Sequence, residues 1–240
     1  MPVAAPQINQ SAIEELLAKA HQSGRRTLTE TESKQVLALA GIRVSREKVV
    51  QSPTDAAAAA RELGVPVVLK IVSPDIAHKS DVGGVRLGLA SPEAVERATE
   101  EMLSSIRTRC PQARIEGILI AEMLAGQEVI LGTATDATFG PVIMFGLGGV
   151  FVETLQDVAF RMIPLDRQDA FAMLSEIKGA ALLNGFRGSP PVNKDSIVAA
   201  ILGLSGLAGR FRNRIQEIDI NPLLATPGGA VAVDALIKLK

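Results

Sequence analysis

The sequence contains no tryptophan and no tyrosine, and only seven of its 240 residues are phenylalanine. Proteins that bind single-stranded nucleic acid usually stack the bases on aromatic side chains, so this composition argues against that class. The formal net charge is −1, so no strong electrostatic attraction to nucleic acid or to anionic lipid is expected. We therefore expect no nucleic-acid partner.

Cysteine is almost absent as well. The one cysteine, Cys110, excludes an intramolecular disulfide and is typical of a protein of the reducing cytoplasm. The segment MPVAAPQINQ has no basic stretch followed by an apolar one, so no signal peptide is expected. The most apolar segment, residues 197–209, is shorter than the roughly 20 residues of a membrane-spanning helix. We interpret it as a buried helix, and we expect a cytoplasmic protein with no membrane partner.

Helical and strand-like segments are interleaved along the chain. Capping-box patterns at Ser11 with Glu14 and at Thr29 with Glu32 predict two helix starts, and Gly41 is a plausible stop for the second helix. The expected helices cover residues 11–20, 29–41, 52–64, 91–109, 166–179 and 193–213. The expected strands cover residues 65–72, 84–90, 117–123, 127–135, 140–148, 159–165, 217–225 and 230–239.

This order of elements predicts a mixed α/β (α+β) fold in which adjacent strands pair antiparallel. The near-continuous apolar run VPVVLKIV predicts a strand buried on both faces. We expect residues 1–23 to form a helical extension. A seam at CPQARIE then divides the remainder into subdomains of residues 24–115 and 116–240.

The segment VVLKIVSPDIAHKSDVGGV carries a first group of candidate residues. A lysine from a buried strand, Lys70, is followed by His78 and by the pair Gly83-Gly84, which lets backbone amides approach a ligand closely. Such amides can cradle phosphate oxygens. The P-loop pattern G-x-x-x-x-G-K-[ST] is absent, and these residues alone also fit an ordinary loop between two strands.

Polar residues near the carboxyl end form a second group. Alternation along a strand places Asp219 and Asn221 on one face, and a turn at Pro227-Gly228-Gly229 would bring Asp234 beside Asn221. Carboxylate and amide oxygens on adjacent strands suit Mg²⁺. A solvated strand face explains the same residues equally well, although Asn and Asp are disfavoured in strands.

Two further segments could line a nucleotide site. In AEMLAGQEVILG, a hinge between Glu122 and Glu128 could offer backbone groups to a purine, and Glu128 could accept from ribose hydroxyls. Two solvated glutamates are the simpler interpretation of this segment. In FGLGGVFVE, glycines at a strand end indicate a tight loop, which is either a plain turn or one wall of the nucleotide site.

Taken together and in this order, these segments are specific. With LLNGFRGSPP and EIDINPL…VDALIKL, they resemble the ATP-grasp (beta) subunit of NDP-forming acyl-CoA synthetases, and most closely the beta subunit of the ADP-forming acetyl-CoA synthetases. The resemblance covers roughly residues 24–240. It is more distant to the succinyl-CoA synthetase beta chains, which share the Asn-Pro-Leu and terminal Asp pattern. An ATP-grasp fold with two subdomains is therefore expected.

The resemblance implies roles for individual residues. Lys70 would contact nucleotide phosphate, and Asn221 and Asp234 would bind Mg²⁺ with Asp219 close by. His78 would take part in a phosphoryl relay, because imidazole is nucleophilic near neutral pH. The remaining nucleotide contacts implied are the phosphate loop at Ser80, Asp81, Gly83 and Gly84, the adenine hinge at Glu122, Met123 and Leu124, and the ribose contact at Glu128.

The expected function is that of an ADP-forming acid–CoA ligase subunit that binds ATP or ADP with Mg²⁺. The chain shows no CoA-binding domain, so activity is expected only in a hetero-oligomer with a CoA-binding alpha subunit or domain that carries the main phosphohistidine. The alternative is a nucleotide-binding regulatory module from a larger fused synthetase or protein acetyltransferase. A carboxylate–amine ligase of the same fold fits less well, because such enzymes need no relay histidine.

Overall fold

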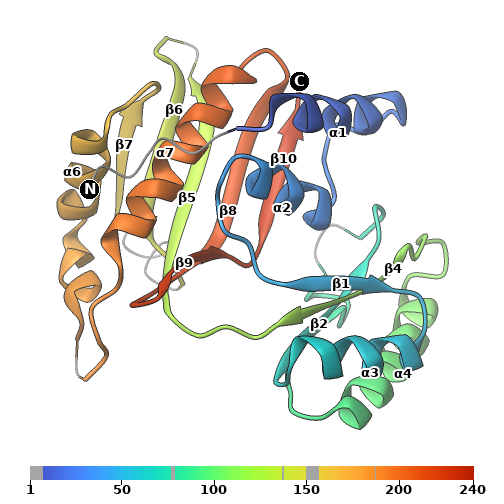
Figure 1. Ribbon diagram of the computed structural model, residues 1–240. Helices are drawn as coiled ribbons and strands as arrows, with labels where there is room; N and C mark the ends of the chain where they lie inside the picture. Colours follow the sequence, from blue (N-terminus) through green and yellow to red (C-terminus); the bar gives the residue numbers. More distant parts are fainter. Residues whose placement is uncertain (1–7, 77–78, 137, 150–156, 187) are drawn as a thin grey trace. The chain divides into compact units, whose positions relative to one another are not determined.

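The computed structural model describes residues 8–76, 79–136, 138–149, 157–186 and 188–240. It divides into two compact units. One unit is formed by residues 45–124, and the other combines residues up to 44 with residues 125–240. Figure 1 shows the path of the chain through both units.

The unit of residues 45–124 is a four-stranded sheet with two helices packed on one face. The strands follow the order β1-β4-β2-β3, and each neighbouring pair is antiparallel. Its core is formed by apolar residues of β2, β4 and the two helices. The strands are β1 (Glu47–Val50), β2 (Val67–Val72), β3 (Val85–Leu89) and β4 (Gly117–Glu122), and the helices are α3 (Pro53–Leu63) and α4 (Pro92–Arg109).

The other unit contains a six-stranded sheet in the order β10-β8-β5-β6-β7, with β9 also paired to β8. Helix α7 packs against β5 and β6, and α2 packs against β10 (Figure 1). The strands are β5 (Gln127–Asp136), β6 (Gly140–Leu147), β7 (Val158–Met162), β8 (Ile215–Thr226), β9 (Gly229–Ala232) and β10 (Ala235–Leu239). The helices are α1 (Gln10–Gln22), α2 (Glu30–Leu39), α6 (Arg167–Glu176), the 3₁₀ helix η1 (Lys178–Asn184) and α7 (Lys194–Arg210).

The mixed α/β class and the antiparallel pairing are confirmed. The capping box at Thr29 and Glu32 is present, and Gly41 follows the end of α2 with a φ of 80°. Helices α3 and α4 each begin after a serine whose hydroxyl accepts a backbone N–H, with proline in the first turn. Local sequence therefore decided where these helices start.

Other local predictions were wrong. Helix α1 is capped by Asn9, whose side chain accepts from the backbone of Ala12, whereas Ser11 lies within the helix. Strand β2 is fully buried on one face only, because α3 and α4 cover that face; Val68, Lys70 and Val72 on the other face are half-buried. Strand β1 was not predicted, because its side chains are half-buried or exposed and it is held by pairing with β4, far along the chain.

The predicted strand of residues 230–239 is in fact two strands, β9 and β10. Strand β9 pairs with the second half of β8 and β10 pairs with its first half. The interruption at Val233 and Asp234 is where the chain passes from one half of β8 to the other. A period-two pattern of apolar residues continues through this break, so the sequence does not reveal it.

The amino-terminal residues belong to the larger unit through backbone hydrogen bonds. The N–H groups of Leu28, Leu239 and Ala232 donate to the carbonyls of Ile237, Arg26 and Arg43, at 3.0, 2.7 and 2.8 Å respectively. Helix α1 adds buried side chains to the same core. The compact units therefore divide at residues 44/45 and 124/125, whereas the sequence divided the chain near residues 23 and 115.

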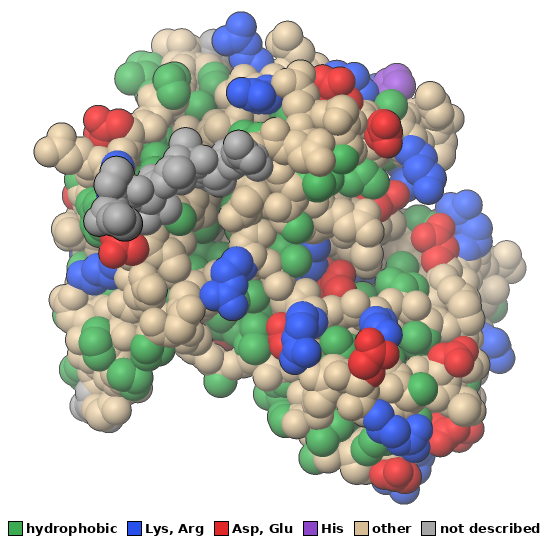
Figure 2. Space-filling view, viewed as in Figure 1, with side chains coloured by type: hydrophobic (Ala, Val, Ile, Leu, Met, Phe, Trp, Pro, Cys, Tyr) green, Lys and Arg blue, Asp and Glu red, His purple; other side chains and the backbone are tan. Residues whose placement is uncertain are grey.

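The surface carries both signs of charge. Over the unit of α3 and α4, at the lower right of Figure 2, basic and acidic side chains are intermixed on the face shown. Ion pairs such as Lys48 with Glu62 and Arg61 with Glu93 belong to this unit. Among the described residues, no helix combines the length and the apolar character that a membrane crossing requires.

The ion pair between Arg25 and Glu32 at the start of α2 makes a testable contribution to stability. The Glu32 carboxylate accepts from Arg25 Nη1 and Nη2 at 2.7 and 2.8 Å and from Thr29 N at 2.8 Å. Burial alone raises the pKa of Glu32, but these hydrogen bonds outweigh it and leave the pKa below its ordinary value of 4.5. The ionised carboxylate therefore stabilises the fold above the unfolded-state pKa, and this stabilisation is lost as pH falls through the lowered folded-state pKa.

We predict that Glu32→Gln lowers the free energy of unfolding by about 1 kcal/mol at pH 7, because the amide keeps the shape but loses the charge. The difference from the unsubstituted chain should vanish in acid. Urea denaturation at a series of pH values measures it, with Glu101→Gln on the exposed face of α4 as the control. An equal loss of stability at pH 7 and in acid would show that the charge is not responsible.

Candidate functional site

The change of partner strand along β8 brings the predicted metal ligands together. The N–H of Asn221 donates to the carbonyl of Asp234 at 3.3 Å, and the N–H of Val233 donates to the carbonyl of Pro222 at 3.2 Å. The hairpin therefore sets Asp234 beside Asn221, as predicted. Asp234 lies in the gap between β9 and β10 rather than on a strand.

Asp219 lies on the face of the larger sheet that is opposite to its helices. Its cross-strand neighbours are Leu236 and Gly132, whereas the adjacent Ile220 faces the core of the unit. A Cβ on Gly132 would lie 3.9 Å from Asp219 Oδ1, so the glycine leaves room beside the carboxylate. Asp219 therefore lies beside a residue without a side chain on this face.

More negative than positive charge surrounds Asp219. Burial raises the pKa of the Asp219 carboxyl, and the carboxylates of Glu217 and Asp234 raise it further, while Lys238 opposes them. Lys238 is itself shared with Glu217, with Nζ to Oε2 at 3.1 Å. A divalent cation would relieve this repulsion.

The residues fit a magnesium site with few protein ligands. Within the part of the chain that the structure describes, no group of three or more His, Cys, Asp or Glu side chains could hold a metal by themselves. Mg²⁺ usually takes one or two carboxylates and fills its remaining positions with water and substrate phosphate. Asp219, Asp234 and the amide oxygen of Asn221 match that donor set.

Glu128 and the glycines after β6 lie together. The N–H of Gly148 donates to the carbonyl of Glu128 at 2.8 Å. A Cβ on Gly148 would come within 2.8 Å of Glu128 Cβ, and a Cβ on Gly149 within 3.2 Å of Glu128 Oε2. Close approach to Glu128 therefore requires glycine at position 148, whereas Gly149 is favoured by its φ of 69°; the Glu128 side chain is exposed. The structure thus places Glu128 next to the glycines after β6, which are separate segments in the sequence.

The carboxylate of Glu122 already has a partner. It accepts from the backbone N–H of Arg46 at 2.9 Å and from Arg46 Nε at 2.8 Å. Met123 donates its N–H to the carbonyl of Pro66 and exposes its side chain. Leu124, half-buried, ends the smaller unit. Sequence reasoning missed the role of Arg46, because no local pattern signals a contact across 76 residues.

Lys70 lies inside β2, paired with Val85 and Leu119, on the face opposite to the helices. The turn that follows is closed by two backbone hydrogen bonds, from Gly83 to Ser80 and from Gly84 to Lys79. A Cβ on Gly84 would come within 2.7 Å of Ile71 Cγ2, so this position needs glycine. Ser80 and Asp81 are exposed in the turn. His78, the predicted relay residue, lies outside the described residues.

The predicted site residues thus form two groups. One group, in residues 45–124, contains Lys70, the turn and the predicted adenine hinge. The other contains Glu128 and the three predicted metal ligands.

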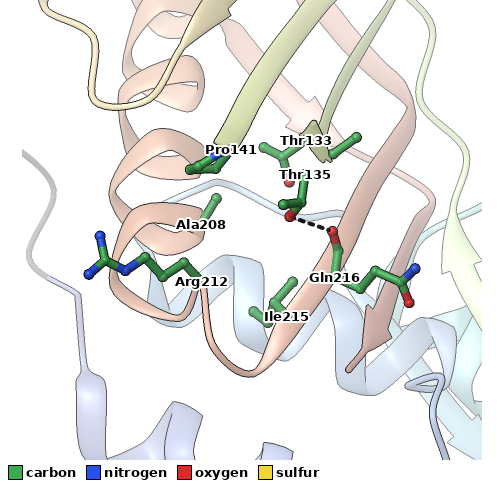
Figure 3. Close-up of a pocket in the computed structure, with 8 residues that line it drawn as sticks. Thr133, Thr135, Pro141, Ala208, Arg212, Ile215 and Gln216 are labelled. Atoms are coloured by element: carbon green, nitrogen blue, oxygen red, sulfur yellow. Dashed lines mark hydrogen bonds between the residues drawn. The ribbon is translucent and has the colours of Figure 1, made fainter. Parts of the chain in front are cut away.

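Two pockets of the larger unit contain none of these residues. One has a volume of about 10 Å³, enough for a single water, between the start of β6 and the end of α7. There the hydroxyl of Thr135 donates to the carbonyl of Gln216 at 3.5 Å (Figure 3). The other, about 390 Å³, is lined by Leu17, His21, Asn213, Arg214, Leu239 and Lys240.

Comparison with known proteins identifies the family of the chain. Residues 19–239 match the model of the ATP-grasp domain family. The chain is 45% identical over 231 residues to the beta subunit of acetate–CoA ligase [ADP-forming] II of Pyrococcus furiosus, which covers 95% of this chain and 96% of that subunit. It is 40% identical to acetate–CoA ligase [ADP-forming] I of Archaeoglobus fulgidus, covering 95% of this chain but only 33% of that longer protein.

A solved structure shows the same fold. Acetyl-coenzyme A synthetase 1 of Ca. Korarchaeum cryptofilum, in complex with coenzyme A and Mg-AMPPCP, superposes with a TM-score of 0.83 at 43% identity, covering 95% of this chain and 100% of that one. Its phosphohistidine segment points towards the nucleotide-binding site. The chain therefore belongs to the ATP-grasp family and, within it, to the beta subunits of the ADP-forming acetate–CoA ligases.

The unbalanced charge at Asp219 predicts a cost in stability. Because its pKa is raised in the folded state, the ionised side chain destabilises the fold above the folded-state pKa, and the cost disappears below the ordinary value of 3.8. We predict that Asp219→Asn raises the free energy of unfolding at pH 7 in the absence of metal, and that this gain fades in acid.

Urea denaturation with EDTA measures the effect. The matched control is Asp136→Asn, because the N–H groups of Phe139 and Thr138 lower the pKa of Asp136, so its ionised form is favoured in the folded state. Asp136→Asn should not stabilise. If Asp219→Asn also fails to stabilise the metal-free protein, the Asp219 carboxylate is adequately compensated in the fold.

Proposed function

We propose that this chain binds MgADP or MgATP and transfers a phosphoryl group between the nucleotide and a histidine relay, as the nucleotide-binding subunit of an ADP-forming acid–CoA ligase. The observation that carries the proposal is the placement of Asn221 against Asp234, with Asp219 on the same side of the sheet as Gly132. This donor set occurs in a chain of the ATP-grasp family.

Each group of residues has a distinct task in this proposal. Asp219, Asp234 and Asn221 would hold Mg²⁺, which offsets charge on phosphate oxygens when it is bound. Lys70 would contact the phosphates from β2, and the backbone of the turn at Ser80–Gly84 would cover them. Glu128, whose backbone carbonyl accepts from the N–H of Gly148, would accept from the ribose hydroxyls with its carboxylate.

The adenine would meet backbone groups rather than the Glu122 carboxylate. That carboxylate accepts hydrogen bonds from Arg46, so Glu122 links the end of β4 to the residue before β1. This anchorage would hold Met123 and Leu124 in place as the adenine hinge. Glu122 is then a positioning residue.

The reaction needs a second polypeptide or domain. The chain matches a beta subunit over nearly its whole length but only a third of a longer ligase, so the remaining activity lies on a separate or fused alpha part. In the proposed relay, a histidine takes the phosphoryl group as the bond from acyl oxygen to phosphorus breaks. His78 then takes the group as the N–P bond to the first histidine breaks, and passes it to a terminal phosphate oxygen of ADP as its own N–P bond breaks. The assembly is a hetero-oligomer that contains this chain and a CoA-binding alpha subunit.

The metal assignment predicts Mg²⁺-dependent nucleotide binding by this chain alone. Asp234→Ala should weaken MgADP binding and abolish the difference between titrations with Mg²⁺ and with EDTA, because a carboxylate ligand is lost. Calorimetry measures both affinities. The control is Glu101→Ala, on the exposed face of α4. Equal affinity with and without Mg²⁺ in the unsubstituted chain would contradict the assignment.

The relay predicts a separation of binding from turnover. His78→Ala should abolish ATP formation from acyl-CoA, ADP and phosphate in the presence of the alpha partner, while MgADP affinity stays within about twofold of the unsubstituted chain, because no phosphate contact is removed. Phosphorylation of the partner by acyl phosphate should persist, since that step precedes the relay.

The decisive measurement is ATP formation from the phosphorylated partner. A His78→Ala chain that still makes ATP at a near-normal rate would show that His78 carries no phosphate. Nucleotide binding without turnover by the unsubstituted chain and partner would instead indicate a regulatory module.

A further inference from the structure

Arg86 donates hydrogen bonds to the backbone at the end of the turn of residues 80–84, which precedes β3. Its Nη1 donates to the carbonyl of Gly83 at 2.8 Å and to that of Val85 at 3.0 Å. Its Nε and Nη2 have no acceptor among the described residues. The guanidinium is therefore held in place by one nitrogen and keeps two others for a further partner.

A second guanidinium meets the first at the same turn. Arg109, the last residue of α4, is exposed. A Cβ built on Gly83 would lie 3.6 Å from Arg86 Nη1 and 4.0 Å from Arg109 Nη1. Gly83 has a φ of 76°, so the position favours glycine and the space beside its Cα stays open. Two cationic groups thus converge on one small space.

Among the described residues, no carboxylate forms an ion pair with this pair of arginines. Within the described part of the chain, neither Arg86 nor Arg109 forms an ion pair, whereas the nearby Arg114 binds Asp75, with Nε to Oδ2 at 3.2 Å. Two guanidinium groups repel each other, and one oxyanion between them removes the repulsion and gains charge-assisted hydrogen bonds. The arrangement therefore suits a carboxylate or phosphate ligand.

The pair lies on a different face from Lys70. In the β2–β3 ladder, Arg86 is opposite Leu69, which is buried under the helices, while Lys70 is opposite Val85. Because side chains alternate along a strand, Arg86 is on the helix side and Lys70 on the other. An anion at the arginine pair is therefore distinct from a nucleotide phosphate at Lys70.

We propose that Arg86 and Arg109 form a binding site for one oxyanion at the helix side of the turn at Ser80–Gly84. The anion is either free phosphate, which the ligase reaction consumes or releases, or a carboxylate side chain of the CoA-binding partner; this choice of sources rests on the function proposed above.

The first test is calorimetry with inorganic phosphate, in a Lys70→Ala background that removes the lysine contact at the nucleotide site. Adding Arg109→Gln should weaken phosphate binding about tenfold, the effect of losing one charge-assisted contact. Arg107→Gln is the matched control, because Arg107 is exposed on the same helix and carries the same charge. It should change phosphate affinity less than twofold.

The second test measures association of the otherwise unsubstituted chain with its CoA-binding partner. If Arg109→Gln weakens association and Arg107→Gln does not, the ligand is a carboxylate of the partner. If only phosphate binding falls, the ligand is free phosphate. If Arg109→Gln changes neither, the site does not exist. MgADP affinity, measured on the same single variants, should be unaffected, so failure of the nucleotide assignment would appear separately.

Discussion

The pairing of the long strand β8 with three other strands is the constraint on which the larger unit and its site depend. One edge of β8 is paired with β5, while β10 and β9 divide the other edge between them. Two short strands cannot share one edge without a break, and the break falls at Asp234, opposite Asn221. The same register sets Asp219 on the face opposite to the helices. The site therefore follows from the way β5, β9 and β10 pair with β8.

The candidate site is not the most stable arrangement of its residues. Burial raises the pKa of the partly buried Asp219, and repulsion by Glu217 and Asp234 raises it further. A structural role would favour a neutral side chain there, since an uncompensated buried carboxylate costs free energy. The cost is understandable if a cation completes the site during function. By contrast, Glu122 is fully engaged by Arg46, which indicates a structural contribution from that side chain.

Glycines have separate tasks in the two units. Gly84 packs against Ile71 and fixes the turn to β2, and Gly148 packs against Glu128. Gly83 leaves the space on which Arg86 and Arg109 converge. All three glycines belong to Gly-Gly dipeptides in the sequence, which do not show what each glycine does. Only the neighbouring side chains in the folded structure show whether a glycine is needed for packing or leaves room for a ligand.

The sequence by itself determined the helix starts at Thr29, Ser52 and Ser91, because capping depends on residues a few positions apart. It also determined the mixed fold, the family and the hairpin that joins Asn221 to Asp234. Tertiary structure alone decided that β1 is a strand, that residues 230–239 divide into two strands, and that Glu122 belongs to Arg46. Strand β1 and the Glu122–Arg46 contact depend on partners about 70 residues away, about which local propensity carries no information. The break at Asp234 depends on which half of β8 each short strand pairs with, and the apolar pattern that continues through it does not reveal that choice.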